Sequence, residues 1–455
     1  MPADKFNKLL SLIALCLGFF MVIIDVTIVN VALPTMAQNL NVGISALQWV
    51  VAGYALTFAC LLLSAGNIGD RLGAKTAFLW GLALFVLTSL GCAMSSVIGW
   101  LTFFRFLQGA ASALLVPTSL ALISASYADT EERARAIGIW AAVGGLAGAS
   151  GPVIGAVLTT WFGWRAVFYV NLPIGIIGFL LTLKYVLNTT SSTKSHFDFA
   201  GQLMGVVSIA ALAFGLIEAG RNGWFAPIVI SSFGIFIASL MAFLMIEKLS
   251  ITPMLPLKFF RSSTFSASIA IGMILNMAAY GELFVLSFYF QQVRGYSVLM
   301  TGLALLPLIG MGVVGSYLGG RVASAIGAKL PIVIGLTMGA VGFIAMLSAG
   351  VHTPAYVILA WPLATIGFGA SFTMPSATIA VINAVPDGNA GIASGAFNAS
   401  RQIGSLLGTA IFGTIITASS HFVRAMHCTL IIGAVLYMCG SLMALIWIKK
   451  PIKIL

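Results

Sequence analysis

The chain has 455 residues, of which 60% are hydrophobic and only 7% are charged, so it cannot fold as an ordinary soluble globule. Its net charge of +11 could suggest a nucleic-acid partner, but no basic patch with interleaved aromatic residues is present. The charges are instead confined to short loops. We therefore predict a protein that lies in the lipid bilayer and binds no nucleic acid.

Apolar runs long enough to cross a membrane recur along the whole chain. A span needs about 20 apolar residues, and this rule predicts fourteen spans. They lie near 8–33, 46–67, 76–97, 100–124, 136–160, 166–187, 200–218, 226–246, 265–291, 299–319, 330–350, 355–382, 391–417 and 428–448. The predicted fold is an all-α multi-pass membrane protein with six-helix bundles over 1–190 and 264–455 and a linker over 191–263 that carries two additional helices.

The first apolar run follows Lys5 and Lys8 as a signal peptide would, but it extends past Val31 without a convincing cleavage site. We therefore expect an uncleaved first span. The five cysteines lie in or beside apolar runs without metal-ligand spacing, so we expect no metal site.

The basic residues are divided unevenly between the two sides of the predicted spans. If both termini are cytoplasmic, sixteen Lys and Arg residues lie on that side and four on the other, with Arg105 and Arg401 inside spans. An excess of Lys and Arg is typical of cytoplasmic loops. The sequence therefore predicts a protein of the cell (inner or cytoplasmic) membrane with both termini in the cytoplasm.

A charged, glycine-rich stretch over 66–75 separates the second and third predicted spans. Glycines allow a tight turn and close helix approach, and the charges mark the point at which hydrocarbon must end. We predict a hairpin between two membrane helices. Its glycines are Gly66, Gly69 and Gly73, and its charged residues are Asp70, Arg71 and Lys75.

The second half of the chain repeats features of the first at a nearly constant offset. Three matches in register indicate a duplicated six-helix unit rather than a coincidence. The Gly-Ala-Lys that ends 66–75 recurs at 327–329, an offset of 254 residues (327 − 73 = 254), with Ser324 and Ala325 in place of the Asp-Arg pair. Gly109 to Pro117 matches Gly367 to Pro375 at an offset of 258 residues. Gly144 with Gly148 matches Gly404 with Gly408 at an offset of 260 residues.

Charges inside spans are costly and usually functional. Asp25 lies about eight residues, or roughly 12 Å, from the outer end of the first span at 1.5 Å per residue, and Arg105 is expected at a similar depth in the fourth. Asp25 is either a proton site whose charge Arg105 controls, or one side of a salt bridge that only docks the two spans. Glu282 lies at a comparable depth in the second half, where it would face Asp25 and bind a proton or a cation, or serve structure alone. Further candidate polar residues of a cavity are Asn30, Gln108, Asn398 and Arg401.

The fifth predicted span carries small residues at helical spacing. Small residues four apart let two helix backbones touch, and a proline removes a backbone hydrogen bond and bends the helix. The pattern Gly-x-x-x-Gly-x-x-Gly-Pro-x-x-Gly consists of Gly144, Gly148, Gly151, Pro152 and Gly155.

Several of these motifs resemble one family. The stretch 66–75 resembles the signature loop of the major facilitator superfamily, with Ala74 where a basic residue is usual. The pattern over 144–155 resembles its antiporter motif, with Ala156 where a final glycine is common. Together with 25–34, 105–109 and 164–173 in the same order, they make the whole chain similar to fourteen-spanner drug:proton antiporters of the EmrB/QacA type.

The resemblance implies roles for individual residues. Asp25 would be the membrane-embedded acid that binds a proton or cation, with Arg105 as its coupling partner. The Asp-Arg pair at 70–71 would be a cytoplasmic lock that steadies the outward-open state, and 151–152 would be the bend that favours antiport over symport. The second-half copy at 324–325 lacks this Asp-Arg pair.

We therefore expect a proton-coupled exporter that uses the proton gradient and no cofactor, with two halves rocking about a central cavity. Each unit of pH difference offers about 1.4 kcal/mol per proton. The 31 Phe, 18 Met and 9 Trp suggest an aromatic-lined cavity suited to lipophilic cations, such as drugs or toxic compounds. A dedicated exporter of a metabolite, siderophore or fatty acid is the main alternative. A proton symporter is less consistent with the antiporter-like pattern in the span 136–160. The sequence identifies neither the substrate, the proton stoichiometry nor a periplasmic adaptor protein.

An intramembrane enzyme is a further alternative that the sequence disfavours. The stretch 148–151 reads Gly-x-Ser-Gly, as in intramembrane serine proteases, but all four histidines lie in or beside predicted loops, away from membrane depth. A structural or sensory membrane protein would not explain charges inside the spans. No Gly-x-x-x-x-Gly-Lys-Ser/Thr sequence is present, so ATP is not the expected energy source.

Overall fold

The computed structural model describes residues 2–127, 129–188, 198–250, 253–351, 355–386 and 389–449. The described chain is helical and forms two compact units, Met1–Gln202 and Leu203–Leu455. The predicted division at 190 and 263 into two bundles and a separate linker stays a prediction. Each unit is described by itself below.

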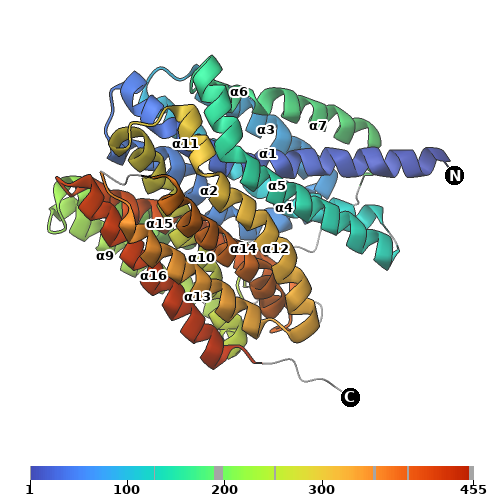
Figure 1. The fold of residues 1–455 in the computed structure, drawn as a ribbon. Helices are drawn as coiled ribbons and strands as arrows, with labels where there is room; N and C mark the ends of the chain where they lie inside the picture. The colour runs from blue at the N-terminus through green and yellow to red at the C-terminus, as the bar shows by residue number, and fades with distance from the viewer. Residues whose placement is uncertain are drawn as a thin grey trace. The chain divides into compact units, whose positions relative to one another are not determined.

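The first unit contains six long helical segments (Figure 1). Long helices are expected in lipid because a helix satisfies its own backbone hydrogen bonds. The start of α5 is fixed by Asp129, whose Oδ1 accepts hydrogen bonds from the backbone N–H groups of Glu131 and Glu132. The helices are α1 (Pro2–Leu40), α2 (Ile44–Leu72), α3 (Ala74–Met94), α4 (Ile98–Ser126), α5 (Thr130–Phe162), and the sixth segment made of α6 (Ala166–Tyr169) and α7 (Asn171–Tyr185).

Most helices of the second unit are also of membrane-spanning length. A short 3-10 helix η1 (Leu257–Arg261) precedes α10, a π-helical turn η2 (Tyr289–Val293) ends it, and a 3-10 turn η3 (Met346–Ser348) follows α13. The remaining helices are α8 (Phe199–Asn222), α9 (Pro227–Leu249), α10 (Ser263–Phe288), α11 (Val298–Ala304), α12 (Leu306–Ile326), α13 (Lys329–Ala345), α14 (Val357–Ile382), α15 (Ala390–Thr417) and α16 (Phe422–Trp447).

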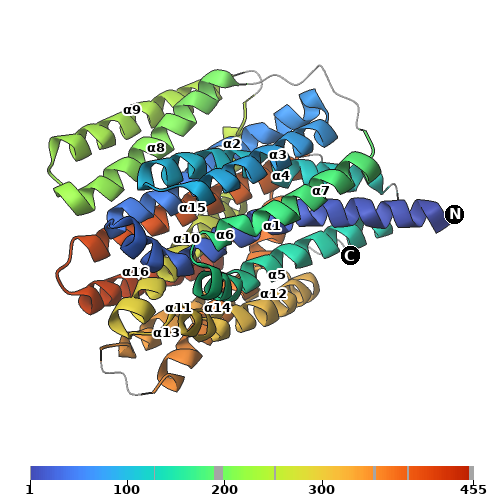
Figure 2. The ribbon, with the colours of Figure 1, turned by 90° about the horizontal axis from the view of Figure 1, so that it is seen from above.

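The two additional helices α8 and α9 lie side by side (Figure 2). Gly205 and Gly215 of α8 face Phe243 and Phe233 of α9, respectively. Thr414 of α15 donates a hydrogen bond of 2.7 Å to a carbonyl oxygen of α8, that of Leu216. The hairpin is therefore attached to α15 within the second unit.

Both units pack their helices in the same way. In the first unit α1 packs against α5 and α7, and α4 packs against α2 and α3; in the second, α10 packs against α15 and α16, and α14 packs against α12 and α13. The glycines of the sequence repeat make these contacts. A Cβ on Gly109 of α4 would lie 2.2 Å from the Tyr54 carbonyl oxygen of α2, and one on Gly367 of α14 would lie 1.8 Å from the Leu308 carbonyl oxygen of α12. This packing supports the predicted duplication.

Thirteen helical segments within the described residues are long and apolar enough to cross a membrane. The predicted span 391–417 coincides with α15, which has 28 residues but is not among the thirteen. Its sequence includes polar residues, among them Asn398, Arg401 and Gln402. The all-helical multi-pass fold is confirmed, whereas the count of fourteen spans stays a prediction.

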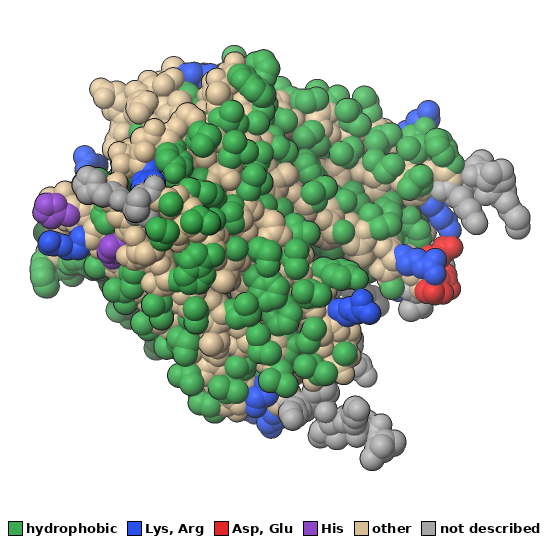
Figure 3. All heavy atoms as spheres, viewed as in Figure 1, with side chains coloured by type: hydrophobic (Ala, Val, Ile, Leu, Met, Phe, Trp, Pro, Cys, Tyr) green, Lys and Arg blue, Asp and Glu red, His purple; other side chains and the backbone are tan. Residues whose placement is uncertain are grey.

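Hydrophobic side chains cover most of the face drawn in Figure 3, and the few charged side chains lie toward its margins. Trp80 is 64% exposed and Ile237 is 59% exposed although both lie in the middle part of long helices. Such a surface is unfavourable in water and favourable against lipid chains.

Two predicted helix ends are wrong. The first span, predicted to end near 33, continues as α1 through Pro34 to Leu40. If the helix ended at Pro34, several backbone groups beyond it would lose their helical hydrogen bonds. Proline inside the helix removes only one such bond, so the longer helix is favoured. The predicted hairpin over 66–75 is also shorter than expected, since α2 continues to Leu72 and α3 begins at Ala74.

Candidate functional site

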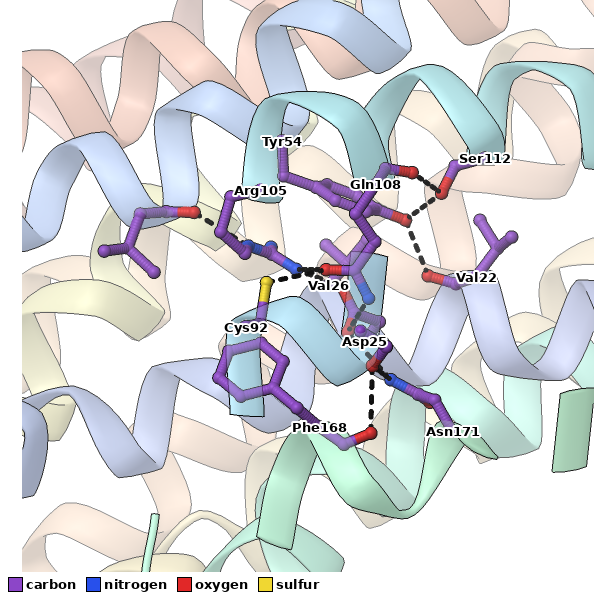
Figure 4. Close-up of polar contacts among 12 residues, drawn as sticks. Val22, Asp25, Val26, Tyr54, Cys92, Arg105, Gln108, Ser112, Phe168 and Asn171 are labelled. Carbon is purple, nitrogen blue, oxygen red and sulfur yellow. Dashed lines mark hydrogen bonds and ion pairs between the residues drawn. The ribbon is translucent and has the colours of Figure 1, made fainter. Parts of the chain in front are cut away.

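A buried ion pair lies at the middle of the first unit (Figure 4). Arg105 Nη1 of α4 donates to Asp25 Oδ2 of α1, and the two side chains are 1% and 0% exposed. The depth predicted for Asp25 assumed that the first span ends near 33, whereas α1 ends at Leu40. The predicted proximity of Asp25 and Arg105 is nevertheless present. Because both charges have left water, each depends on the other for compensation.

Arg105 is held from three further directions. Its Nε donates to the backbone carbonyl oxygen of Val50 in α2 at 2.9 Å, and Nη1 also donates to Gln108 Oε1 at 2.8 Å. Its guanidinium lies 4.3 Å from the centroid of the Tyr54 ring, within the range of a cation–π contact. A planar guanidinium suits this arrangement because its donors are fixed in one plane while its face remains free to stack.

Asp25 accepts hydrogen bonds from two amides in addition to Arg105. Gln108 Nε2 donates to Asp25 Oδ1 at 3.2 Å, and Asn171 Nδ2 of α7 donates to the same oxygen at 3.1 Å. Asn171 Nδ2 also lies 3.1 Å from Ser89 Oγ of α3, which donates to the carbonyl oxygen of Phe168. All partners of the carboxyl group are donors, so the geometry suits an ionised Asp25. We call Asp25, Arg105, Gln108 and Asn171 the Asp25 centre.

A second polar chain joins the Asp25 centre to α1 and α2. The Tyr54 hydroxyl donates to the Val22 carbonyl oxygen at 3.1 Å and lies 2.7 Å from Ser112 Oγ. Ser112 Oγ in turn lies 3.0 Å from the carbonyl oxygen of Gln108. Helices α1, α2, α3, α4 and α7 therefore all contribute a polar group to this network.

The glycines of α5 lie against α1, next to the Asp25 centre. Added Cβ atoms on Gly144 and Gly151 would lie 2.2 Å from Phe19 Cε1 and 1.9 Å from Thr27 Oγ1 of α1. One on Gly155 would lie 2.6 Å from a backbone oxygen of α1, whereas Gly148 has only an ordinary contact at 3.4 Å. The predicted close approach of two backbones is therefore present, and Pro152 lies inside α5. The bend expected at Pro152 and its role in antiport stay predictions.

The stretch 66–75 turns at a single residue. Gly73 has φ of +84° between α2 and α3, and Gly327 has φ of +87° at the corresponding place between α12 and α13. Gly66 and Gly69 lie inside α2, so the expectation that they take part in the turn is wrong. A helix is preferred because it pairs the backbone groups that a longer loop would leave open.

The charged residues of this stretch are placed only in part. Lys75 Nζ donates to the Leu183 carbonyl oxygen near the end of α7 at 3.1 Å, which suits a cation at a helix C-terminus. Arg71 is exposed and its backbone lies in the last turn of α2. The side chain of Asp70 lies outside the described part of the structure, so the cytoplasmic lock stays a prediction.

The polar candidates of the second unit form two separate groups. Glu282 of α10 is 1% exposed, and its Oε2 lies 3.3 Å from Thr429 Oγ1 of α16. Arg401 of α15 donates through Nη1 to Asn398 Oδ1 at 3.0 Å, and its buried Nε has no hydrogen-bond partner among the described residues. Because the units are described separately, the expectation that Glu282 faces Asp25 stays a prediction.

Asn30 is a predicted site residue outside the Asp25 centre. Asn30 is 1% exposed on α1, where its Nδ2 donates to the Val26 carbonyl oxygen at 3.0 Å, and within the described part of the chain no hydrogen bond joins it to Asp25. Asn171 and Tyr54 were missed as members of the centre. Asn171 lay within the motif at 164–173, and a buried amide beside an intramembrane acid could have indicated it; Tyr54 carried no signal in the sequence.

The architecture is that of a secondary membrane transporter: two helical units share one packing pattern, the first holds a buried acid–cation pair, and the second carries the additional helices α8 and α9. A family model described as the Major Facilitator Superfamily matches residues 15–409. The chain belongs to this superfamily, and it is a multi-pass transporter of small molecules rather than an enzyme.

Curated relatives cover most of the chain. A methylenomycin A resistance protein of Streptomyces coelicolor is 33% identical over 96% of this chain and 92% of its own length. One of the same name from Bacillus subtilis is 38% identical over 90% and 88%. The multidrug resistance protein Stp of Mycobacterium tuberculosis is 37% identical over 90% and 76%. These relatives are resistance proteins of the drug-efflux kind.

Solved structures share the fold at low sequence identity. A bacterial homologue of the human lysosomal transporter Spinster, in an inward-facing and unoccupied conformation, has a TM-score of 0.69 and 17% identity over 98% of this chain and 99% of that chain. The nucleoside transporter NupG has a TM-score of 0.65 and 15% identity over 97% and 100%. At these identities the likeness shows the fold alone.

Proposed function

We propose that this chain is a proton-coupled antiporter that exports lipophilic, cationic drugs or toxic compounds across the cell membrane by alternating access. The observation that carries the proposal is the buried Asp25–Arg105 pair. When a fully enclosed carboxylate with one cation partner is protonated, its contacts with the surrounding helices change. The names of the relatives, which include multidrug and tetracenomycin C resistance, support the substrate class.

The geometry links proton binding to the position of Arg105. A proton on Asp25 removes the charge that holds Arg105 Nη1, while the bonds of Arg105 to Val50 and Gln108 remain. The guanidinium then gains by moving toward another acceptor, and α1 and α4 lose the ion pair between them, while Gln108 of α4 still reaches Asp25. In this cycle a proton enters from outside, neutralises Asp25 and leaves to the cytoplasm, and the substrate crosses in the opposite direction.

The alternative of a dedicated exporter is favoured by one observation. Arg401 has no carboxylate within ion-pair distance among the described residues, although its Nε is buried. An unpaired guanidinium suits an acidic substrate group better than a cation. Such a substrate would be a metabolite, siderophore or fatty acid that carries a carboxylate.

Transport assays in proteoliposomes separate these functions. Vesicles with an inward proton gradient are exposed to ethidium, to tetraphenylphosphonium, or to the carboxylate laurate, and proton release is followed with a pH dye. Proton flux triggered by the cations and lost in Asp25→Asn is the expected result. Flux triggered by laurate alone would replace the drug antiporter with the dedicated exporter, and flux unchanged in Asp25→Asn would remove Asp25 from the coupling.

The membrane orientation is tested independently of the substrate. We propose that both termini face the cytoplasm, as the excess of basic residues in loops on that side suggests. Protease should remove tags at either end from inverted vesicles and spare them in right-side-out vesicles. The reverse pattern for either terminus would contradict the proposed orientation. No observation on this chain favours or opposes a periplasmic adaptor.

A further inference from the structure

The distances between heavy atoms around Glu282 indicate how its carboxyl group is bonded. Thr429 Oγ1 lies 2.7 Å from the carbonyl oxygen of Met426 and 3.3 Å from Glu282 Oε2. A hydroxyl carries one hydrogen, so it cannot donate fully to two acceptors. The shorter bond assigns that hydrogen to Met426. An oxygen lone pair of Thr429 is then left facing Glu282 Oε2, which suits a carboxyl group that itself carries a hydrogen.

The other oxygen of Glu282 also lacks a donor. Oε1 is buried and has no hydrogen-bond partner among the described residues, and the side chain is 1% exposed. An ionised carboxylate in such a place would leave its charge uncompensated, at a cost that a neutral carboxylic acid avoids. Burial and hydrogen bonding therefore both favour the neutral, protonated form of Glu282.

Among the described residues, no charged side chain on the helices packed against α10 is bonded to Glu282. The titratable residues there have other partners or lie toward helix ends: Arg401 of α15 bonds Asn398, His427 of α16 lies 2.6 Å from the Ala349 oxygen, and Tyr289 of η2 donates to the Gly350 oxygen. Helix α14 contains no Asp, Glu, Lys, Arg or His. The remaining groups are Tyr280 of α10, Arg424, Cys428, Tyr437 and Cys439 of α16, and Lys258 and Arg261 of η1.

The sequence repeat relates Glu282 to Asp25. The offset 282 − 25 = 257 lies within the range 254 to 260 set by the three glycine matches. Each acid lies on the first helix of its six-helix set and meets a polar side chain of the last helix, Asn171 in one case and Thr429 in the other. The difference is the fourth helix, since α4 supplies a cation to Asp25 and α14 has none to offer Glu282.

We propose that Glu282 and Thr429 form a second proton-binding site, in which Glu282 is a neutral carboxylic acid that donates to Thr429 Oγ1 in the arrangement seen. Asp25 and Glu282 are then two acids related by duplication and held in opposite protonation states. Release of the proton leaves a carboxylate and one free proton, and requires water or a cationic group to reach the site. The role in transport rests on the proposed antiport: each turnover then carries one proton more than Asp25 alone allows.

Infrared spectroscopy of the purified full-length protein in lipid tests the site without any substrate. A protonated carboxyl group has a carbonyl stretch that a carboxylate lacks. The wild type should show this band, with a shift in heavy water and loss as the pH is raised. Glu282→Gln should remove it, whereas Asp25→Asn should leave it in place, as should Glu218→Gln, which changes a half-buried acid bonded to Asn222.

Thr429→Val provides a variant that keeps the carboxyl group. Removal of the acceptor should move the band of Glu282 without abolishing it. If Glu282→Gln leaves the wild-type band unchanged, or if the band is absent at every pH at which the protein stays folded, Glu282 is ionised and the inference is overturned. A Glu282 band in a protein that shows no proton-coupled export would overturn the proposed function alone, while export with no such band would overturn this inference alone.

Discussion

Removal of either partner of the Asp25–Arg105 pair should destabilise the first unit, and removal of both should cost less than the sum. Arg105→Met leaves Asp25 with the amides of Gln108 and Asn171 but no cation. Asp25→Asn leaves Arg105 with Val50, Gln108 and the ring of Tyr54. The double variant contains no buried charge at this place.

The expected magnitudes follow from burial. Breaking one side of a buried ion pair costs about 3–5 kcal/mol, so we expect about 4 kcal/mol for Arg105→Met at a site where both side chains are 0–1% exposed. Asp25→Asn should cost about 2 kcal/mol because three contacts of Arg105 survive, each worth about 1 kcal/mol. If the double variant costs about 4 kcal/mol, the coupling energy is about 2 kcal/mol.

The free energy of unfolding is measured for the four proteins by titration with sodium dodecyl sulfate in mixed micelles, with helix content as the signal. A coupling energy near 2 kcal/mol would support the pair as an interdependent unit. Single effects that add to within about 0.5 kcal/mol would refute this reasoning, since independent sites behave in that way. Size-exclusion chromatography before titration shows that each variant begins from a folded state.

Three further comparisons test the packing and the surface of the first unit, the two glycine pairs by the same titration and Tyr127 by thermal unfolding. Gly151→Ala should cost about 3 kcal/mol through overpacking against α1, and Gly148→Ala, with its nearest contact at 3.4 Å, should be tolerated; equal effects would contradict the close approach. Gly73→Ala, at φ of +84°, should cost about 1 kcal/mol, whereas Gly66→Ala, in open space inside α2, should stabilise by about 0.5–1 kcal/mol. Burial raises the pKa of Tyr127, so its contribution to stability is complete below the unfolded value of about 10 and is lost as the pH rises through the folded value. Wild type should therefore lose more thermal stability than Tyr127→Phe above that pH, and parallel curves would show that Tyr127 contributes nothing.

The residues that matter most were partly visible in the sequence. Asp25 and Arg105 stood out because charges are rare inside apolar runs, and the estimate of depth placed them near each other. Asn171 lay within the motif at 164–173, but no role was assigned to it. Tyr54 carried no signal because a tyrosine in an apolar run resembles any packing residue. Which polar group meets which acid depends on helix rotation and register, which a single sequence does not specify.

The sequence by itself determined the membrane environment, the approximate positions of the spans, the duplication and the two buried acids, because these follow from local composition and from spacing along the chain. Only the tertiary structure decided that Asp25 has a cation and two amides while Glu282 has a threonine and one oxygen without a hydrogen-bond partner among the described residues. The physical reason is that a carboxyl group's charge state depends on donors from other helices. Helices far apart in the chain, α1 with α4 and α7, and α10 with α16, bring those donors together or leave them out.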